Sequence, residues 1–334
     1  MKFNSMVPLI FVETGRRPSR YLINNLSITK SRFPEQEIIL ILSKKFINYI
    51  EIQGIELIAE EDLSPNVSSI EFELIAKQWK RRQLDFWINT TKRFFILGKY
   101  MEEKKIEQLI HLESDCVLLN INGIKSLFDA PNWGIKFPKQ HNGLGCASIF
   151  IVNKRESLNS FLKFVINNWH LDEITDMDLL GAFVDNGEEA SFLPSGDLVE
   201  LSNTQVFDAV SIGHYFLGAD ARNQRYPFSN RGGRDLNPGS LSMLEPKLAL
   251  NSSGCIVYSD SNLPKLELAN VHVHSKKIPK NYATLEKMLL RDSRREKNCI
   301  WKIGAFDYLV FLERLVSYMN RRIFGKKGFE LRLR

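Results

Sequence analysis

The sequence lacks an apolar run that approaches the roughly 18 to 20 residues needed to cross a bilayer, and its N-terminus is interpreted as a strand rather than a signal peptide. Its four cysteines are scattered and form no Cys-x-x-Cys pair, which argues against a zinc site of that kind and against a disulfide framework. A reducing, cytoplasmic setting fits this cysteine usage. Gly-x-Gly-x-x-Gly and Walker motifs are also absent, so an ordinary dinucleotide site or ATP P-loop is not expected.

The chain has 334 residues, of which 44% are hydrophobic and 25% are charged, as in a globular protein of one large or two small domains. Its net charge of +6 is concentrated at the C-terminal end. Residues 291–334 contain twelve Lys and Arg against five Asp and Glu, a local charge of +7, so the remaining 290 residues sum to −1. The basic character therefore belongs to the tail and not to the fold.

Strand and helix patterns alternate at the start of the chain. Apolar runs at 8–12, 37–42 and 55–58 predict buried strands, and residues 21–26 follow the first run with helical spacing. This alternation favours a parallel sheet with helices on its faces.

Two features are candidate nucleotide contacts. Thr14, Gly15 and Arg16 form a polar turn after the first predicted strand, where backbone N–H groups and arginine can meet a base and phosphates. Arg93 lies in a basic, amphipathic helical stretch at 72–105, beside aromatic residues that can pack while its guanidinium is free to reach phosphate. The alternative for this stretch is a solvated basic helix face.

The run at 108–112 predicts a buried strand that stops at Glu113-Ser114-Asp115. At a spacing of i, i+2 on an extended backbone, Glu113 and Asp115 point to the same side. Open α/β sheets bind ligands outside the carboxyl ends of their strands, and two carboxylates there suit Mg²⁺ or Mn²⁺ bridged to phosphate. The alternative is a solvated loop that happens to be acidic.

Residues 142–148 are mostly small, so their backbone can approach a ligand closely, and they lead into a predicted strand at 149–153. Farther along, Thr175 or Asp176 can cap a helix that begins there, since acidic residues suit the helix dipole. Capping explains Asp176 well and Asp178 less well, which leaves Asp178 as a candidate for chemistry.

Residues 205–265 are irregular and rich in glycine and aromatic residues, as expected for a binding loop or lid rather than a disordered segment. We expect 205–240, which includes Asp220, to bind an acceptor or to close over a donor. His272 and His274 follow on a predicted strand and share one face, beside two lysines. Such histidines are either core residues or ligands.

Taken in order, these features resemble the GT-A fold nucleotide-sugar glycosyltransferases, and the nearest pattern is that of the glycogenin-like retaining family. The features that carry the resemblance are the Thr14-Gly15-Arg16 turn, Arg93, Glu113-Ser114-Asp115, the strand at 145–153, the acidic helix start at 176–178 and the histidine strand. His272 stands seven residues before Pro279, as in that family. Glu113 replaces the first Asp of the family's metal motif, and Ile278 replaces its lysine.

The resemblance implies a Rossmann-like mixed, mostly parallel α/β sheet with helices on both faces and a C-terminal helical extension. It also implies a Mn²⁺ or Mg²⁺ ion and a nucleotide-sugar donor, with a UDP-sugar as the first candidate. Asp115 would hold the ion, Glu113 would assist it or bind the ribose, and His272 or His274 would complete the site.

Further roles follow from the same resemblance. Lys276 and Lys277 would share the negative charge of the leaving diphosphate. An inverting enzyme also needs a general base, for which Asp176, Asp178 and Asp220 are the candidates. A retaining enzyme needs instead a group beneath the anomeric carbon, and the sequence leaves both courses open.

We expect a catalytic domain over 1–285, with a nucleotide-sugar half to about 120 and an acceptor half over 121–285. The basic, amphipathic segment 286–334 would then associate peripherally with an anionic inner-membrane surface, where a glycan or lipid-linked acceptor of bacterial surface polysaccharide is extended. The alternatives are a sugar-1-phosphate nucleotidyltransferase, a related protein with an inactive site, and a non-catalytic nucleotide- or nucleic-acid-binding protein. The tail is the one feature in favour of nucleic acid, so we expect no nucleic-acid partner.

Overall fold

A computed structural model describes residues 7–15, 17–78, 84–130, 133–140, 143–169, 174–187, 189–195, 205–218, 247–259 and 265–290. Within these residues, the central sheet has seven strands in the order β3-β2-β1-β4-β7-β6-β8. The strands are β1 (Leu9–Glu13), β2 (Ile38–Leu42), β3 (Glu56–Ala59), β4 (Leu109–Leu112), β6 (Ile135–Pro138), β7 (Ile149–Val152) and β8 (Ala190–Leu193). β7 runs antiparallel to both of its neighbours, and the other pairs are parallel.

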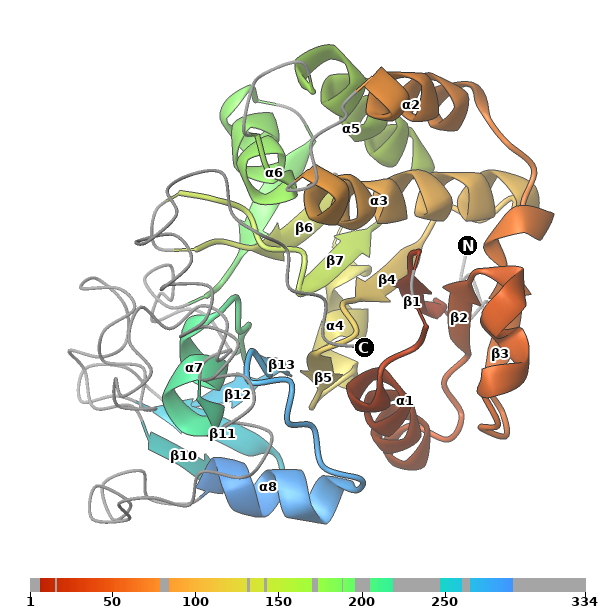
Figure 1. The fold of residues 1–334 in the computed structure, drawn as a ribbon. Helices are drawn as coiled ribbons and strands as arrows, with labels where there is room; N and C mark the ends of the chain where they lie inside the picture. The colour runs from red at the N-terminus through yellow and green to blue at the C-terminus, as the bar shows by residue number, and fades with distance from the viewer. Residues whose placement is uncertain are drawn as a thin grey trace, which may run out of the picture.

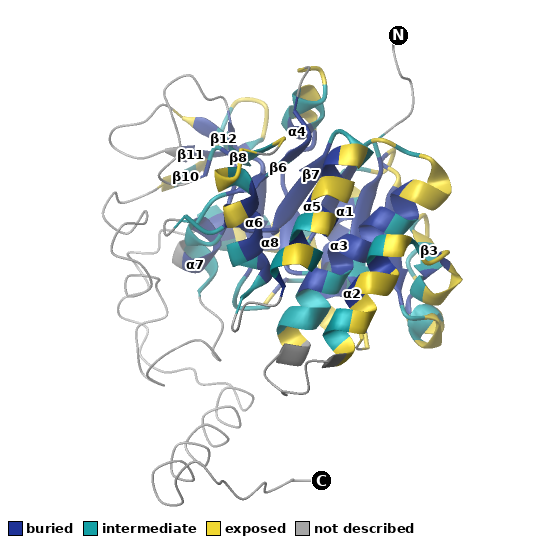
Figure 2. Cartoon of the chain, turned by 90° about the horizontal axis from the view of Figure 1, so that it is seen from above, coloured by how far each residue is buried: buried dark blue, intermediate teal, exposed yellow. Residues whose placement is uncertain are grey.

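Helices cover both faces of this sheet (Figure 1). One layer contains α2 (Val67–Gln78), α3 (Leu84–Lys104), α5 (Arg155–Asn168) and α6 (Asp176–Asp185). The opposite layer contains α1 (Arg20–Arg32) and α4 (Asn122–Leu127), and the short 3₁₀ helices η1 (Lys44–Tyr49) and η2 (Glu60–Asp62) lie near β3. The helix faces turned toward the sheet are buried and the outer faces are exposed (Figure 2).

Side-chain alternation on the buried strands explains the two layers. On β2, Ile38, Leu40 and Leu42 join the core under α1, whereas Ile39 and Ile41 join the core under α3 and α5. Every residue of β2 is therefore buried, as expected for a central strand covered on both sides. The expected mixed, mostly parallel α/β sheet with helices on both faces is confirmed.

A second, smaller assembly lies beside the carboxyl end of β4 (Figure 1). It contains a sheet in the order β10-β11-β12-β9 and a ribbon of β13 with β5, packed with two helices. The elements are β5 (Cys116–Leu118), β9 (Gln205–Val206), α7 (Ser211–Leu217), β10 (Lys247–Leu250), β11 (Ile256–Ser259), β12 (Leu266–Leu268), β13 (Asn270–His272) and α8 (Tyr282–Leu290). The segment expected to be irregular thus forms regular elements over its described residues, and the boundary expected at 285 falls inside α8.

Several expectations lie outside the described residues. These are Arg16, the part of the expected acceptor loop at 219–246 with Asp220, and the basic tail from 291 onward. Among the helices that the structure describes, none is long and apolar enough to cross a membrane.

Candidate active site

The Glu-Ser-Asp turn lies at the carboxyl end of β4, where the sequence places it. The Glu113 N–H donates at 3.1 Å to the backbone oxygen of Ser148, the residue before β7, and the Cys116 N–H closes the turn onto Glu113 O at 2.9 Å. From α1, the Asn25 amide donates to Ser114 O at 3.2 Å and to Cys116 O at 2.8 Å. Backbone contacts on both sides therefore fix the direction in which the two carboxylates point.

His272 approaches these carboxylates from β13, which pairs antiparallel with β5 so that His272 lies opposite Cys116. Its Nε2 is 3.3 Å from Glu113 Oε2 and 3.4 Å from Asp115 Oδ2. Its Nδ1 donates to Ala209 O at 2.6 Å, so Nε2 is the nitrogen directed at the acids.

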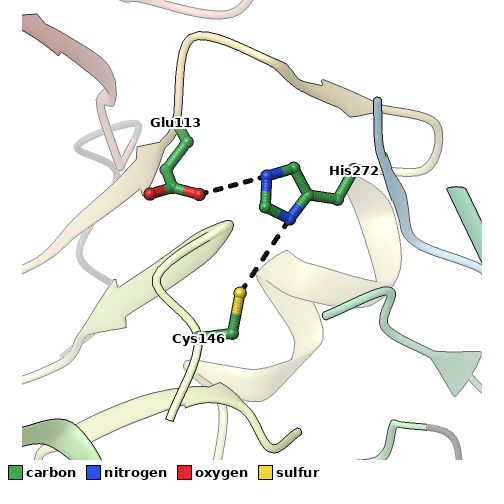
Figure 3. A group of neighbouring side chains, drawn as sticks. All are labelled: Glu113, Cys146 and His272. Atoms are coloured by element: carbon green, nitrogen blue, oxygen red, sulfur yellow. Dashed lines mark hydrogen bonds and ion pairs between the residues drawn. The ribbon is translucent and has the colours of Figure 1, made fainter. Parts of the chain in front are cut away.

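This donor set fits the metal that the resemblance implies. Two carboxylates, the ligand type that suits Mn²⁺ and Mg²⁺, converge with one imidazole nitrogen. A sulfur also lies close, since the ligand atoms of Glu113, Cys146 and His272 are within 4.8 Å of one another. Figure 3 shows the imidazole between the Glu113 carboxylate and the Cys146 sulfur. Burial would lower the pKa of His272, but Cys146 and Glu113 outweigh that effect and raise the pKa to about 10.

Asp208 positions His272 and was not nominated from the sequence. Its buried carboxylate accepts hydrogen bonds from the backbone N–H groups of Ile212 at 3.0 Å, Gly213 at 2.7 Å and His272 at 2.8 Å. It thereby joins β13 to the start of α7. Position 213 requires glycine, because a Cβ there would lie 1.9 Å from His272 O. The signal in the sequence was an acid shortly before a helix start, which is a common cap.

Arg93 is buried between two acids. One terminal nitrogen pairs with Glu113 Oε1, and the other lies 2.6 Å from Asp176 Oδ2. Burial would raise the pKa of Glu113, but the charge of Arg93 and then that of His272 outweigh it and hold the pKa well below its ordinary value. The expected free guanidinium is therefore a wrong prediction, since both of its terminal nitrogens already have carboxylate partners. A contact between Arg93 and a nucleotide stays a prediction.

The roles expected for Asp176 and Asp178 are reversed. Thr175 is the N-cap of α6, and its N–H donates to Asp178 Oδ2 at 2.9 Å while the Asp178 N–H donates to Thr175 Oγ1 at 3.2 Å. Asp178 therefore completes a capping box. Asp176 is instead buried against Arg93, and its Oδ1 has no hydrogen-bond partner among the described residues. Burial raises the pKa of Asp176, and Arg93 opposes that rise only in part.

The residues after His272 make different contacts. His274 stacks on His272 with ring centroids 3.9 Å apart and on His214 at 4.2 Å, and burial lowers its pKa well below the ordinary value. The Lys276 ammonium forms an ion pair with the Asp115 carboxylate. Lys277 is exposed. The two histidines are thus neighbours, as expected, but only His272 is directed at the acids.

Two segments that the sequence predicts to lie near a ligand make packing contacts in the described structure. The Thr14 hydroxyl donates to Asn89 O of α3 at 3.1 Å, and a Cβ at Gly15 would lie 3.3 Å from the Asn89 side chain. At Gly145 a Cβ would lie 2.4 Å from Leu180 Cβ, so glycine is needed there for close approach to α6. A nucleotide contact by the turn after β1 stays a prediction.

Comparisons with known proteins give only structural likenesses. No family model matches the chain, and no curated protein matches it. Among similar solved structures are the glycosyltransferase PaToxG (11% identity, TM-score 0.38, 53% of this chain and 68% of that one) and mouse xyloside xylosyltransferase 1 (12%, 0.40, 57% and 86%). The galactosyltransferase LgtC with donor and acceptor sugar analogues is another (14%, 0.35, 56% and 73%). The functional argument below rests on the side chains of this chain.

Proposed function

We propose that this protein is a metal-dependent glycosyltransferase that moves a sugar from a nucleoside-diphosphate sugar to a hydroxyl group of a glycan or lipid-linked glycan. The observation that supports this most is the convergence of Glu113, Asp115 and His272 at the carboxyl end of β4. This is the edge at which open α/β sheets bind ligands. Lys276, which forms an ion pair with the Asp115 carboxylate, adds a positive charge at that edge.

Asp115, Glu113 and His272 would hold Mn²⁺ or Mg²⁺, and the bound ion supplies Lewis-acid neutralisation of the charge on the leaving diphosphate. Arg93 orients Glu113 through its ion pair, and Asp208 orients His272 through the backbone. These two residues keep the oxygen and nitrogen donors pointed at one place.

The remaining assignments are part of the same proposal. Lys276 and Lys277 contribute positive charge toward the diphosphate of the donor, for which a UDP-sugar is the first candidate. On an inverting course Asp176 or Asp220 takes the proton of the acceptor hydroxyl as the bond between sugar and diphosphate breaks. Asp178 is a poorer candidate for the general base than Asp176 or Asp220, because its carboxylate closes the capping box. The anomeric configuration of the product, read by NMR, separates inversion from retention.

A thermal-shift screen of UDP, GDP, CDP and CMP, each with and without Mn²⁺, tests the proposal. A ligand at about 100 times its dissociation constant stabilises the folded state by about 2.7 kcal/mol. We expect one diphosphate to stabilise the protein in Mn²⁺ and the matching nucleotide sugar to be hydrolysed slowly without acceptor. In Asp115→Asn, Mn²⁺ should no longer increase the stabilisation by the diphosphate or the hydrolysis of the nucleotide sugar. The melting temperature of this variant without ligand should be unchanged. Release of pyrophosphate from a nucleoside triphosphate and a sugar 1-phosphate would indicate a nucleotidyltransferase instead.

We also propose that the enzyme works on the cytoplasmic face of a bacterial inner membrane in surface polysaccharide synthesis. The support is the local charge of +7 in residues 291–334, since each Lys or Arg near an anionic surface contributes about 1 kcal/mol of attraction. The acceptors of such pathways are lipid-linked, so a basic tail brings the site to them.

A further inference from the structure

Lys276 lies on the carboxylate that the proposed function assigns to the metal. Its ammonium pairs with Asp115 Oδ2, and the Lys276 side chain is 30% exposed whereas that of Asp115 is 5% exposed. His272 Nε2 lies 3.4 Å from the same oxygen. Asp115 therefore already has a positively charged partner in Lys276, and Glu113 has one in Arg93, before any other cation is present.

The backbone holds Lys276 at this place. The Val273 N–H donates to Asp115 O at 2.8 Å, and the Lys276 N–H donates to Val273 O at 2.8 Å in the turn that follows β13. Lys276 has a φ of +57°, a left-handed conformation in which glycine is the usual residue. Its Nζ also lies 5.5 Å from the centre of the Tyr21 ring. The turn thus places a long, flexible cation, in strained backbone, at the rim of the site.

An ammonium and a divalent ion compete for one carboxylate oxygen, because the two positive charges repel each other strongly at so short a distance. The nearest strong anion that a donor nucleotide would bring is its diphosphate, and a four-carbon stem lets the ammonium turn toward it. Asp115 would then be released at the moment when the diphosphate arrives.

We propose that Lys276 is a displaceable counter-ion that couples nucleotide binding to metal binding. Without ligands it neutralises Asp115, and with a nucleoside diphosphate it moves to the phosphates and leaves Asp115 to the ion. Because binding linkage is reciprocal, each ligand then raises the affinity for the other by the same factor. This inference rests on the proposed function, since it takes the metal and the diphosphate from it.

The test is a set of calorimetric titrations of the full chain with Mn²⁺ alone, with UDP alone, and with each in the presence of the other, corrected for the Mn²⁺–UDP complex in solution. In Lys276→Met we expect Mn²⁺ alone to bind at least about fivefold more tightly, the lower end of the factors found for linked sites, and UDP alone to bind more weakly. The coupling between the two ligands should fall to the part that comes from direct contact of the ion with the diphosphate.

Two variants serve as controls. Lys276→Arg retains the positive charge and should retain the weak binding of Mn²⁺ alone. Lys280→Met removes a nearby, exposed lysine that has no assigned role in the site, and it should leave the affinity for Mn²⁺ alone unchanged. A thermal melt of each variant shows whether it is folded.

The outcomes separate the two proposals. If the unaltered protein binds both ligands but Lys276→Met binds Mn²⁺ alone no more tightly, Lys276 is a structural ion-pair partner and the inference is wrong. If Lys276→Met does not fold, the unaltered protein and Lys276→Arg decide the question. Independent binding of Mn²⁺ and UDP to the unaltered protein would then overturn the inference. Coupled binding, together with an unchanged Mn²⁺ affinity in Lys276→Arg, would support it. If the unaltered protein binds neither UDP nor any other nucleoside diphosphate, the proposed function fails, and the inference fails with it.

Discussion

Replacement of Arg93 by methionine should destabilise the protein more than the loss of an ordinary ion pair. Arg93 is 8% exposed and lies between the carboxylates of Glu113 and Asp176. Glu113 keeps a second partner, His272 at 3.3 Å, but Asp176 Oδ1 has no hydrogen-bond partner among the described residues. The free-energy cost therefore falls mainly on Asp176, as a buried charge without its cation. Breaking such a pair from one side costs about 3 to 5 kcal/mol.

Urea denaturation of Arg93→Met at pH 7, followed by circular dichroism, measures this cost as a loss in the free energy of unfolding. The matched control is Arg93→Met with Asp176→Asn, which removes the stranded charge as well. We expect the double variant to recover at least half of the loss, because replacing both members of a buried pair is far less costly than removing one. A loss of about 1 kcal/mol or less in the single variant, the value of a solvent-exposed pair, would refute the reasoning.

Three further predictions concern acid stability, the positioning of His272 and the tail. His111 is fully buried, and burial together with the charge of Arg93 lowers its pKa from 6.5 to about 3. The unfolded chain therefore takes up a proton at His111 below pH 6.5 while the folded protein does not. The contribution of the neutral His111 to stability is thus complete above pH 6.5 and is lost as the pH falls toward 3. Between pH 7.5 and 5.0 the loss is about 2 kcal/mol at about 1.4 kcal/mol per pH unit, and unfolding curves of His111→Leu should lack this component. Asp208→Asn should weaken Mn²⁺ binding by about 10- to 100-fold in calorimetry, since it disturbs the support of a ligand, and an unchanged affinity would contradict that role. Deletion of residues 325–334 should reduce sedimentation with anionic liposomes at low salt without changing turnover on a soluble acceptor.

The main features of the fold could be predicted because they depend on local patterns. The apolar runs at the first three strands, the helical stretch before β4 and the small-residue approach to β7 all correspond to elements of the structure. What local patterns do not contain is the pairing of distant strands. β5 pairs with β13 across more than 150 residues, so the ribbon that carries His272 to Glu113 was implied only by a family resemblance.

Part of the site could be predicted for the same reason. The local pattern placed the two carboxylates after β4 at one edge of the sheet and made the two histidines neighbours, whereas the meeting of His272 with these acids was implied only by the resemblance. Cys146 and Asp208 were missed, because their importance comes from contacts with His272 over 126 and 64 residues of sequence. Neither residue belongs to a motif that a scan of one sequence would single out.

The reversal of Asp176 and Asp178 has a local cause that was present in the sequence. Thr175-Asp176-Met177-Asp178 is a capping-box pattern, in which the acid three residues after the threonine returns to the N-cap backbone. Interpreted in that way, the spacing assigns the Asp178 side chain to the cap. The side chain of Asp176, the first residue of the helix, then has no part in the capping box and can contact another element. Only the fold then shows that it points at Arg93, 83 residues earlier, and that Arg93 in turn holds Glu113. The guanidinium was expected to meet phosphate because a basic helix beside a nucleotide site suggests it. A buried arginine with two carboxylates already in contact instead acts on the site through Glu113, so a change at Asp176 should be felt at the metal-binding edge of β4 although Asp176 is not itself expected to hold the ion.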